Sequence, residues 1–262
     1  MAKISGSFVR LSLPRRIINH FLSGTGRMPL VTGQRRLRLA EVIAARAQAK
    51  PRPSWAALFT KAFAAVCARQ PELRRTFVAW PWARVFQYDA PVVSVVTGRE
   101  YEGEHALFLA RVKNPDQLPL ARIQDTLNRY KTSPIKEIDR LRYTLRLAAL
   151  PGFIRHPLWW LVTNVMPRLK AQCLGTHGIS PTTGMRSSGI HVVSPWTIVL
   201  HYDVPHENGD MDVRFTFDHR VYDAAVLGLA GGAIEQELCG PILAELRAMR
   251  PAAEEPGNRK AA

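Results

Sequence analysis

Residues 215–224 read FTFDHRVYDA, and this short stretch governs the interpretation of the rest of the chain. Apolar and polar side chains alternate up to Phe217, which is typical of a strand with one buried face. His219 follows at once, and Asp223 stands four residues later. A histidine at a strand end is either a hydrogen-bonded structural residue or a general base held in a cleft. The spacing of one histidine and one aspartate does not decide between these interpretations.

The stretch closes a predicted hairpin. Residues 196–204 and 211–218 have strand character, and the Asn208-Gly209 pair between them favours a tight turn. A helix is predicted over 223–238, ending near Gly240-Pro241. Strand, turn and helix therefore surround His219, which suits a rigidly held side chain.

Elsewhere, helical and extended segments are mixed along the chain. Helical periodicity predicts helices over 13–22, 37–50, 54–70 and 119–132, whereas 28–33, 83–98 and 106–113 have extended character. Because the two types do not alternate strictly, the pattern predicts an α+β layered fold in which helices pack on a mixed β-sheet. We expect one domain over residues 1–250 and a disordered tail over 251–262.

The composition indicates a basic protein with a sizeable core. The chain has 262 residues, of which 47% are hydrophobic, and 36 Lys and Arg against 21 Asp and Glu give a net charge of +15. This charge suits a phosphate-bearing partner, such as nucleic acid, an anionic membrane or a nucleotide-like cofactor. Arginine excess also arises in GC-rich genomes, so charge alone does not identify the partner. No nucleic-acid-binding motif is present, and we expect no nucleic-acid partner.

Cysteine usage and hydropathy suggest a cytoplasmic protein. Cys67, Cys173 and Cys239 lie far apart without C-x-x-C spacing, which favours neither a disulfide framework nor a metal site. The first residues lack the apolar run of a signal peptide. Prolines and charges interrupt the most apolar window, 147–166, so no membrane-spanning helix is predicted.

The string FTFDHRVYDAAVLG resembles the D-H-R-x-x-D-G signature in the catalytic domain of the 2-oxo acid dehydrogenase acyltransferases, the E2 components, and more distantly the H-H-x-x-x-D-G motif of chloramphenicol acetyltransferase. Further segments are similar to that family in the same order, from about residue 8 to 246. They are SLPRRIINHFL, SWAALFTKAFAAVCARQPELRRTF, FLARVKNPDQLPLARIQDTL, GTHGIS and GIHVVSPWTIVLHY. The resemblance implies a chloramphenicol acetyltransferase-like fold.

The resemblance also implies the chemistry. His219 would deprotonate the attacking group of an acceptor, classically the thiol of coenzyme A or dihydrolipoamide, which then attacks an acyl thioester without an acyl-enzyme. In the family a hydroxyl of the G-T-F-T-I-S segment stabilises the oxyanion, and Ser180 matches it best. Thr182 and Thr183 stay open, because this segment departs from the family pattern at His177 and Pro181.

The remaining family residues have supporting roles. Asp223 would pair with an arginine of the first helix, Arg15 or alternatively Arg16, and so fix the loop that holds the histidine. Asp218 and Arg220 complete D-H-R and are expected to be structural. Ala224 stands where the motif has glycine, and it would be strained if that position needs a positive φ.

The family builds its site between subunits of a trimer, so a homotrimer is implied, with larger assembly left open. The sequence contains no D-K-A lipoylation motif. We therefore expect a stand-alone acyltransferase whose substrate is a coenzyme A or phosphopantetheine thioester, the latter on an acyl-carrier protein, with no covalently bound lipoyl group. The alternative is a catalytically silent scaffold protein that kept the trimer.

Residues 138–174 are bulkier and more basic than the corresponding family segment, and the pattern over 138–170 predicts two broken amphipathic helices. One interpretation is a lid or a membrane-surface patch, in which Phe153, Trp159 and Trp160 contact lipid. In that case Arg155, Arg168 and Lys170 would meet phosphates. The other interpretation is ordinary packing of two helices on the sheet, with the arginines pointing outward.

Overall fold

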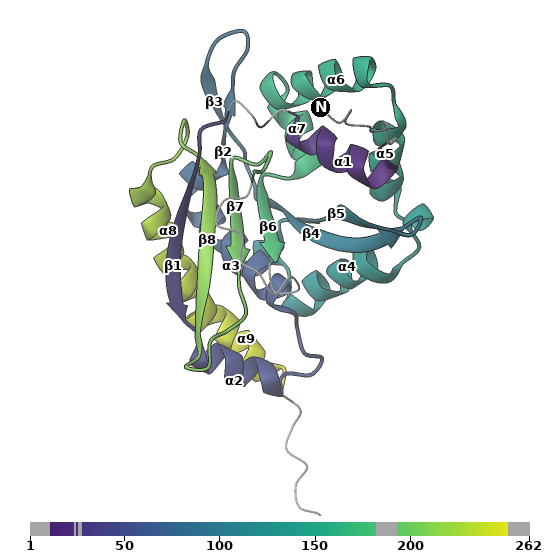
Figure 1. Ribbon diagram of the computed structural model, residues 1–262. Coiled ribbons are helices and arrows are strands. Elements are labelled where there is room, and N and C mark those ends of the chain that lie inside the picture. Colours follow the sequence, from purple (N-terminus) through teal and green to yellow (C-terminus); the bar gives the residue numbers. More distant parts are fainter. Residues whose placement is uncertain (1–10, 24, 26–27, 182–192, 251–262) are drawn as a thin grey trace, which may run out of the picture.

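The computed structural model describes residues 11–23, 25, 28–181 and 193–250. Within these residues a six-stranded sheet is surrounded by helices, and a small two-stranded hairpin stands apart (Figure 1). The helices are α1 (Leu13–Leu22), α2 (Ala40–Gln48), α3 (Trp55–Arg69), α4 (Leu120–Thr132), α5 (Asp139–Ala149), α6 (Gly152–Asn164), α7 (Pro167–Leu174), α8 (Ala224–Glu237) and α9 (Leu243–Ala248). The predicted α+β architecture is confirmed.

The large sheet is mixed, with strand order β1-β8-β7-β6-β4-β5. Its strands are β1 (Leu30–Arg38), β4 (Val92–Tyr101), β5 (Glu104–Lys113), β6 (His177–Pro181), β7 (Ile198–Tyr202) and β8 (Asp210–Asp218). Strand β6 runs parallel to both of its neighbours, β4 and β7, and the other pairs are antiparallel. The separate hairpin joins β2 (Arg75–Val78) and β3 (Arg84–Gln87).

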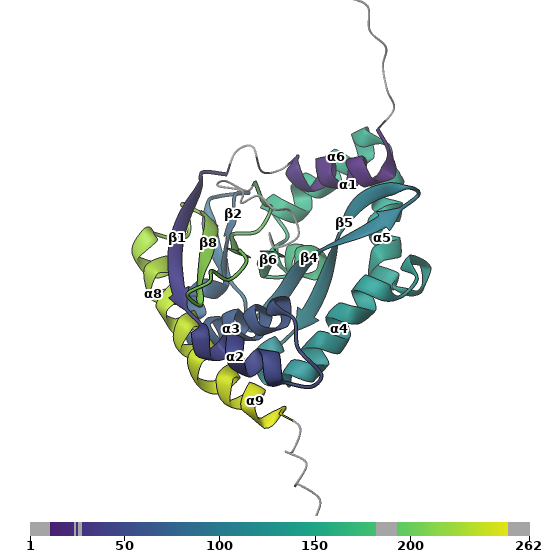
Figure 2. The ribbon, with the colours of Figure 1, turned by 60° about the horizontal axis from the view of Figure 1, so that its bottom comes forward.

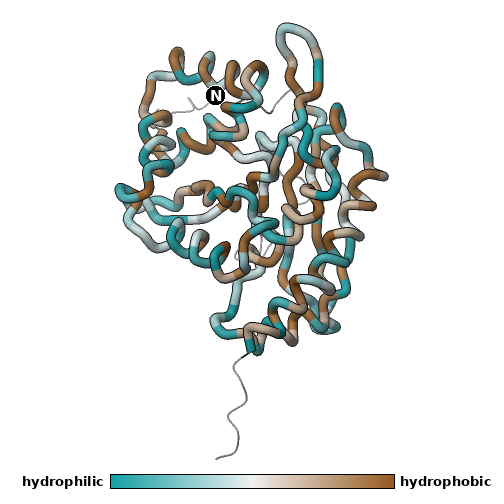
Figure 3. The backbone as a smooth tube through the Cα atoms, turned by 180° about the vertical axis from the view of Figure 1, so that it is seen from behind, coloured by the Kyte–Doolittle hydropathy of each residue, from teal (hydrophilic) through white to brown (hydrophobic). Residues whose placement is uncertain are grey.

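One face of the sheet forms the main core. Seen from its end in Figure 2, the sheet carries α8, α9, α3 and α4 on this face. Ser54 caps α3 by accepting a hydrogen bond from the Ala57 N–H at 3.2 Å, and the alanine-rich helix can then approach the strands closely. Its Phe59 ring stacks on Tyr202 of β7, with centroids 4.6 Å apart. Figure 3 shows long hydrophobic stretches along the strands, as a sheet covered in this way requires.

A second helical group, α1, α5, α6 and α7, packs beside β5 at the other edge (Figure 1). The segment 138–170 thus forms three helices, where the sequence predicted two, because the chain breaks at both Pro151 and Pro167. Trp159 and Val162 of α6 turn inward and pack with Leu174 and Trp196.

The hairpin prediction is confirmed, while two boundaries are corrected. β7 pairs with β8 as expected, and Gly209 in their connection has φ +85°, which suits glycine. Strand β1 extends to Arg38, so the predicted helix over 37–50 begins only at Ala40; Leu37 is buried opposite Met211. The last helix passes through Gly240-Pro241 in one π-helical segment, Leu238–Ile242, and continues as α9.

Candidate active site

His219 lies just beyond the end of β8, at the edge of the sheet. Its backbone N–H donates to the Pro29 carbonyl at 2.9 Å, which ties the residue to the start of β1. Its side chain is 51% exposed, so the imidazole is open to the surface of the isolated chain. The ring also meets Phe217 edge-on, at 6.0 Å between centroids. Position and access both suit a proton-transfer group.

The hydrogen bonds of His219 determine its tautomer. Nδ1 lies 2.9 Å from the Tyr222 carbonyl oxygen. A carbonyl oxygen only accepts, so Nδ1 of the neutral ring must carry the proton, and Nε2 then has a free lone pair. No hydrogen bond to Nε2 is found among the described residues. The neutral ring therefore presents a base to whatever lies in front of Nε2.

Two anchors hold the turn that carries this ring. Asp218 is 1% exposed and accepts hydrogen bonds from Arg220, at 2.9 Å from Nε and 2.7 Å from Nη2. The Tyr222 hydroxyl reaches into the interior and donates to either the Leu73 carbonyl at 2.8 Å or the Arg75 carbonyl at 3.0 Å. Asp218 and Arg220 are thus structural, as expected, while the sequence analysis overlooked Tyr222.

Lys170 lies near the same turn, since the charges of Asp218 and Arg220 act on its pKa, and it was also misjudged. It lies buried on α7, where Nζ donates to Thr76 Oγ1 at 3.0 Å. Burial lowers the pKa of Lys170 to about 8, against a smaller opposite effect of Asp218. Lys170 stands in a segment of arginines that were expected to point outward, so nothing in the sequence indicates that it is buried. The expectation that Lys170 meets phosphates at a membrane is wrong, and so is that for Arg155, which is buried and donates to the Ala148 carbonyl at 2.8 Å.

The structure does not bring Arg15 and Asp223 together. Arg15 is exposed on α1, and no ion pair of its side chain is found in the part of the chain that the structure describes. Arg16, the alternative, donates instead to the Leu11 carbonyl at 3.0 Å. The Asp223 side chain is 80% exposed, and its Oδ1 lies 3.6 Å from His219 Nδ1. Asp223 therefore faces the histidine itself rather than an arginine of the first helix.

Ala224 fits its position without strain. It is the first residue of α8, directly after the extended N-cap residue Asp223, and it is not among the residues with positive φ. It is also exposed, so its methyl group needs no close approach to other backbone. The departure from glycine at this place in the motif therefore does not distort the His219 turn.

Ser180 lies on β6, a parallel strand in the middle of the sheet. It lines an apolar pocket of about 140 Å³ together with Leu107 and Leu109 of β5, Trp196 and His201. It also lines a wider hollow on its other side, which is bordered by α4. Thr182 and Thr183, the alternatives to Ser180, lie outside the described residues, as does the tail over 251–262.

Ser180 and His219 are far apart in one chain. The register places Ser180 opposite His201 and His201 opposite Arg214, and His219 follows Arg214 by five residues. Two strand spacings and five residues along a strand separate the two side chains by roughly 20 Å. A site that uses both residues therefore needs a second copy of the chain.

His177 replaces an aromatic residue of the family pattern and keeps its packing role. The buried ring meets Phe63 edge-on at 5.0 Å. Nε2 lies 2.8 Å from the Leu73 carbonyl and Nδ1 lies 2.5 Å from Thr176 Oγ1. Burial lowers the pKa of His177 to about 4, so the ring is neutral near pH 7. The unusual residue is thus a satisfied core histidine and not a proton donor of the site.

Among the described residues, no group of three or more His, Cys, Asp and Glu side chains could hold a metal ion. None of the helices in the described ranges is both long and apolar enough to traverse a bilayer.

Comparisons with known proteins identify the fold. No protein-family model matches the chain, and no curated protein matches it. Solved structures do match. The truncated catalytic core of the 2-oxoacid dehydrogenase multienzyme complex from Thermoplasma acidophilum has a TM-score of 0.62 at 12% identity, over 90% of this chain and 99% of that one. The cubic core of a pyruvate dehydrogenase multienzyme complex has a TM-score of 0.56 at 16% identity, over 93% and 94%.

A third match is the dihydrolipoamide acetyltransferase of Azotobacter vinelandii, with a TM-score of 0.59 at 14% identity, over 94% of both chains. In that protein a serine, a histidine and an asparagine four positions after the histidine were studied for their roles in catalysis. The predicted fold, that of the dehydrogenase acyltransferase catalytic cores, is confirmed.

Proposed function

We propose that the protein is an acyltransferase in which His219 acts as the general base. The observation that carries the proposal is the free Nε2 of an imidazole whose other nitrogen is bound to the Tyr222 carbonyl. The Azotobacter acetyltransferase, which shares the fold, has a histidine and an asparagine at the same four-residue spacing as His219 and Asp223. Acyl transfer is the reaction that this arrangement supports best.

In the proposed reaction, Nε2 of His219 takes the proton of an acceptor thiol or hydroxyl as that group attacks the carbonyl carbon of an acyl thioester. The tetrahedral oxyanion is stabilised by the Ser180 hydroxyl of a neighbouring chain. The intermediate collapses, the carbon–sulfur bond breaks, and the imidazolium returns its proton to the departing thiolate. The Asp223 carboxylate, 3.6 Å from Nδ1, favours the transient imidazolium.

A homotrimer would supply the neighbouring chain. Because roughly 20 Å separates Ser180 and His219 within one chain, a site that uses both residues takes them from two copies. The similar pyruvate dehydrogenase structure forms a cubic core, and a cube has threefold axes. The donor we propose is a thioester of coenzyme A or of carrier-bound phosphopantetheine, and the net charge of +15 suits the phosphates or acidic face of such partners.

The direct test is release of free thiol from a panel of acyl-CoA donors with thiol, alcohol and amine acceptors. We expect turnover by the wild type and a loss of at least about a hundredfold in His219→Ala, since a general base contributes that much or more. His206→Ala is the matched control, because His206 is a half-exposed histidine that pairs with Asp212. Absence of turnover by the wild type on every donor would favour the alternative of a silent scaffold.

We also propose that the protein is cytoplasmic and touches membranes through an exposed aromatic surface. This surface, here called the tryptophan face, consists of Phe153, Leu158, Trp160 and Leu161 of α6 with Trp80 and Trp82 of the neighbouring β2–β3 connection. The Trp80 N–H donates to the Asn164 carbonyl at 3.2 Å, so the two parts adjoin. Exposed tryptophans beside basic residues suit an anionic bilayer surface.

Vesicle co-sedimentation tests this contact. We expect binding to vesicles that contain phosphatidylglycerol, and weaker binding by Trp82→Ser and Trp160→Ser. Leu229→Ser is the control, because Leu229 is 73% exposed on α8, away from the tryptophan face (Figure 1). Equal binding by all four proteins would refute the contact, and a change of oligomeric state in the tryptophan variants would assign the face to a second copy.

A further inference from the structure

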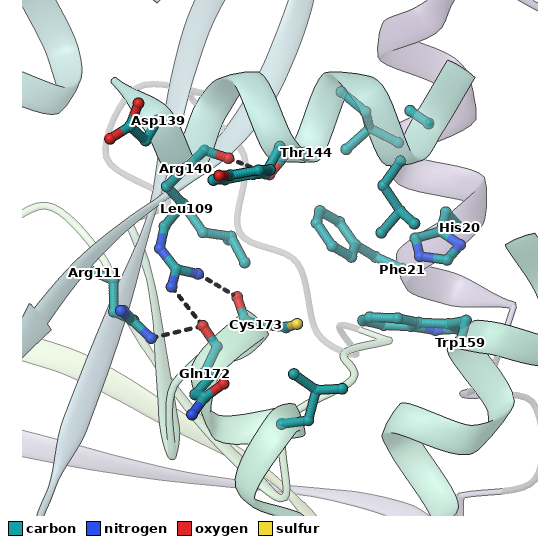
Figure 4. A pocket seen from close by; sticks show the side chains of 15 residues that line it. His20, Phe21, Leu109, Arg111, Asp139, Arg140, Thr144, Trp159, Gln172 and Cys173 are labelled. Atoms are coloured by element: carbon teal, nitrogen blue, oxygen red, sulfur yellow. Dashed lines mark hydrogen bonds between the residues drawn. The ribbon is translucent and has the colours of Figure 1, made fainter. Parts of the chain in front are cut away.

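A cavity of about 440 Å³ lies between α1, β5, α5, α6 and α7 (Figure 4). We call it the α1–α5 pocket. Its volume is in the range of small-molecule sites. Neither His219 nor Ser180 lines it, although Phe21 and Leu109 line both this pocket and the smaller one beside Ser180. The reaction proposed above gives it no role.

Two arginines lie close together at one end of the α1–α5 pocket. Arg111 Nη1 and Arg140 Nη2 both donate to the Gln172 carbonyl, at 2.6 and 2.5 Å, and Arg140 also donates to the Cys173 carbonyl at 3.0 Å (Figure 4). Burial, with the Arg140 charge, lowers the pKa of Arg111.

No ion pair of Arg111 or Arg140 is found among the described residues, and Asp139, the acid in the lining, is paired with Arg142. Two neighbouring guanidinium groups with N–H groups to spare and no acidic partner are a site for an anion.

The middle of the pocket is apolar. Its walls come from α1, α5, α7 and β5, and its aliphatic and aromatic lining consists of Ile17, Phe21, Leu109, Leu147, Ala148 and Leu169. In Figure 4 Phe21 lies between the arginine end and the opposite end. This part can bury a hydrocarbon chain but offers it no hydrogen bonds.

The opposite end contains buried polar groups without partners. His20 is 2% exposed, and neither of its ring nitrogens has a hydrogen-bond partner among the described residues; the same is true of Trp159 Nε1. The two rings lie together, with centroids 4.4 Å apart. Each buried polar group left unpaired costs about 1–3 kcal/mol, so such groups in a cavity point to a ligand atom that pairs with them.

The chemistry of this end favours a hydroxyl or carbonyl. Burial and the charges of Arg155 and His156 lower the pKa of His20 to about 4, so its ring is neutral near pH 7 and offers one donor and one acceptor. Trp159 Nε1 only donates. A hydroxyl group can bond with both, and a carbonyl oxygen can accept from both.

We propose that the α1–α5 pocket binds an amphipathic carboxylate, with its carboxylate on Arg111 and Arg140, its hydrocarbon chain along Phe21 and Leu109, and an oxygen near its far end bonded to His20 and Trp159. The pocket is a binding site that the acyl-transfer reaction does not require, and the inference does not rest on that reaction.

Calorimetric titration with decanoate, ω-hydroxydecanoate and decan-1-ol tests the site. Wild-type protein is expected to bind ω-hydroxydecanoate more tightly than decanoate, and decanoate more tightly than decan-1-ol. Arg140→Gln weakens both carboxylates about tenfold, the loss of one charge-assisted hydrogen bond, and leaves decan-1-ol unchanged. His20→Phe and Trp159→Phe each remove the advantage of the hydroxylated chain and leave decanoate unchanged.

Arg146→Gln is the matched control, because Arg146 is exposed on the same helix and does not line the pocket. It is expected to bind all three probes as the wild type does. No binding of any probe by the wild type, or equal weakening by the Arg140 and Arg146 variants, overturns the proposal. Turnover of decanoyl-CoA stays unchanged in Arg140→Gln, and a parallel loss of turnover would instead make the pocket part of the acyl-transfer site.

Discussion

His177 offers a quantitative test of how the centre of the sheet is held together. In the neutral ring, Nε2–H donates to the Leu73 carbonyl and Nδ1 accepts from the Thr176 hydroxyl, so both nitrogens are satisfied. A second proton on the ring would place a charge in the buried core. Burial, with a smaller effect of the Arg74 charge, is therefore the reason why the pKa of His177 falls to about 4 in the folded protein.

The size of the effect follows from the two pKa values. In the unfolded chain the imidazole titrates near 6.5, whereas in the folded protein it titrates near 4. Between these values the unfolded state binds a proton that the folded state does not bind. The contribution of His177 to stability is therefore complete above pH 6.5 and is lost as the pH falls towards 4, by about 2 kcal/mol between pH 7 and pH 4.5.

Chemical denaturation of wild type and His177→Phe at pH 7 and pH 4.5 measures this loss. The phenyl ring keeps the packing on Phe63, and the Tyr222 hydroxyl still reaches the Leu73 carbonyl. Other groups titrate in both proteins and cancel in the difference. The wild type should lose about 2 kcal/mol more than the variant between the two pH values. Equal losses would show that His177 is not a neutral core residue.

Three further substitutions test the site and its support. Asp223→Asn should lower the transfer rate by less than about fivefold in steady-state assays, because an exposed carboxylate 3.6 Å from Nδ1 interacts weakly; a hundredfold loss would contradict this. Gly178→Ala should lower the free energy of unfolding by about 1–3 kcal/mol, since a Cβ there would lie 2.6 Å from the Trp196 ring; unchanged stability would mean that the ring moves freely. Tyr222→Phe should cost about 1–2 kcal/mol in the same measurement, and a neutral result would show that its hydroxyl does not anchor the His219 turn.

The sequence predicts best where local pattern and long-range contact agree. Alternation along 211–218 and the Asn208-Gly209 turn specify the β7–β8 hairpin, because a one-residue slip would turn every apolar side chain away from the core. The helix predicted over 37–50 begins too early. Leu37 and Arg38 pair with β8 and so belong to strand β1, despite their helix propensity. Leu238 and Ile242 are buried in the main core, and the chain passes through Pro241 in a π-helical turn, where the proline alone predicts a helix end.

The candidate site is predictable in part for the same reason. The position of His219 follows from one strand end and one turn, both local features. The Tyr222 anchor and the burial of Lys170 do not follow from local features, because they involve Leu73 and Thr76, which are distant in sequence. The α1–α5 pocket also depends on helices that meet only in the folded chain, and no spacing in the sequence marks it.

If His219 of one chain and Ser180 of another form one site, trimers that mix two inactive variants recover activity. His219→Ala and Ser180→Ala chains are each expected to be nearly inactive. In trimers assembled from equal amounts of both, each interface draws its histidine and its serine from different chains, so about one quarter of the interfaces contain both intact residues. We predict recovery of about one quarter of the wild-type rate, and a mixture no more active than the two separate variants would contradict the account.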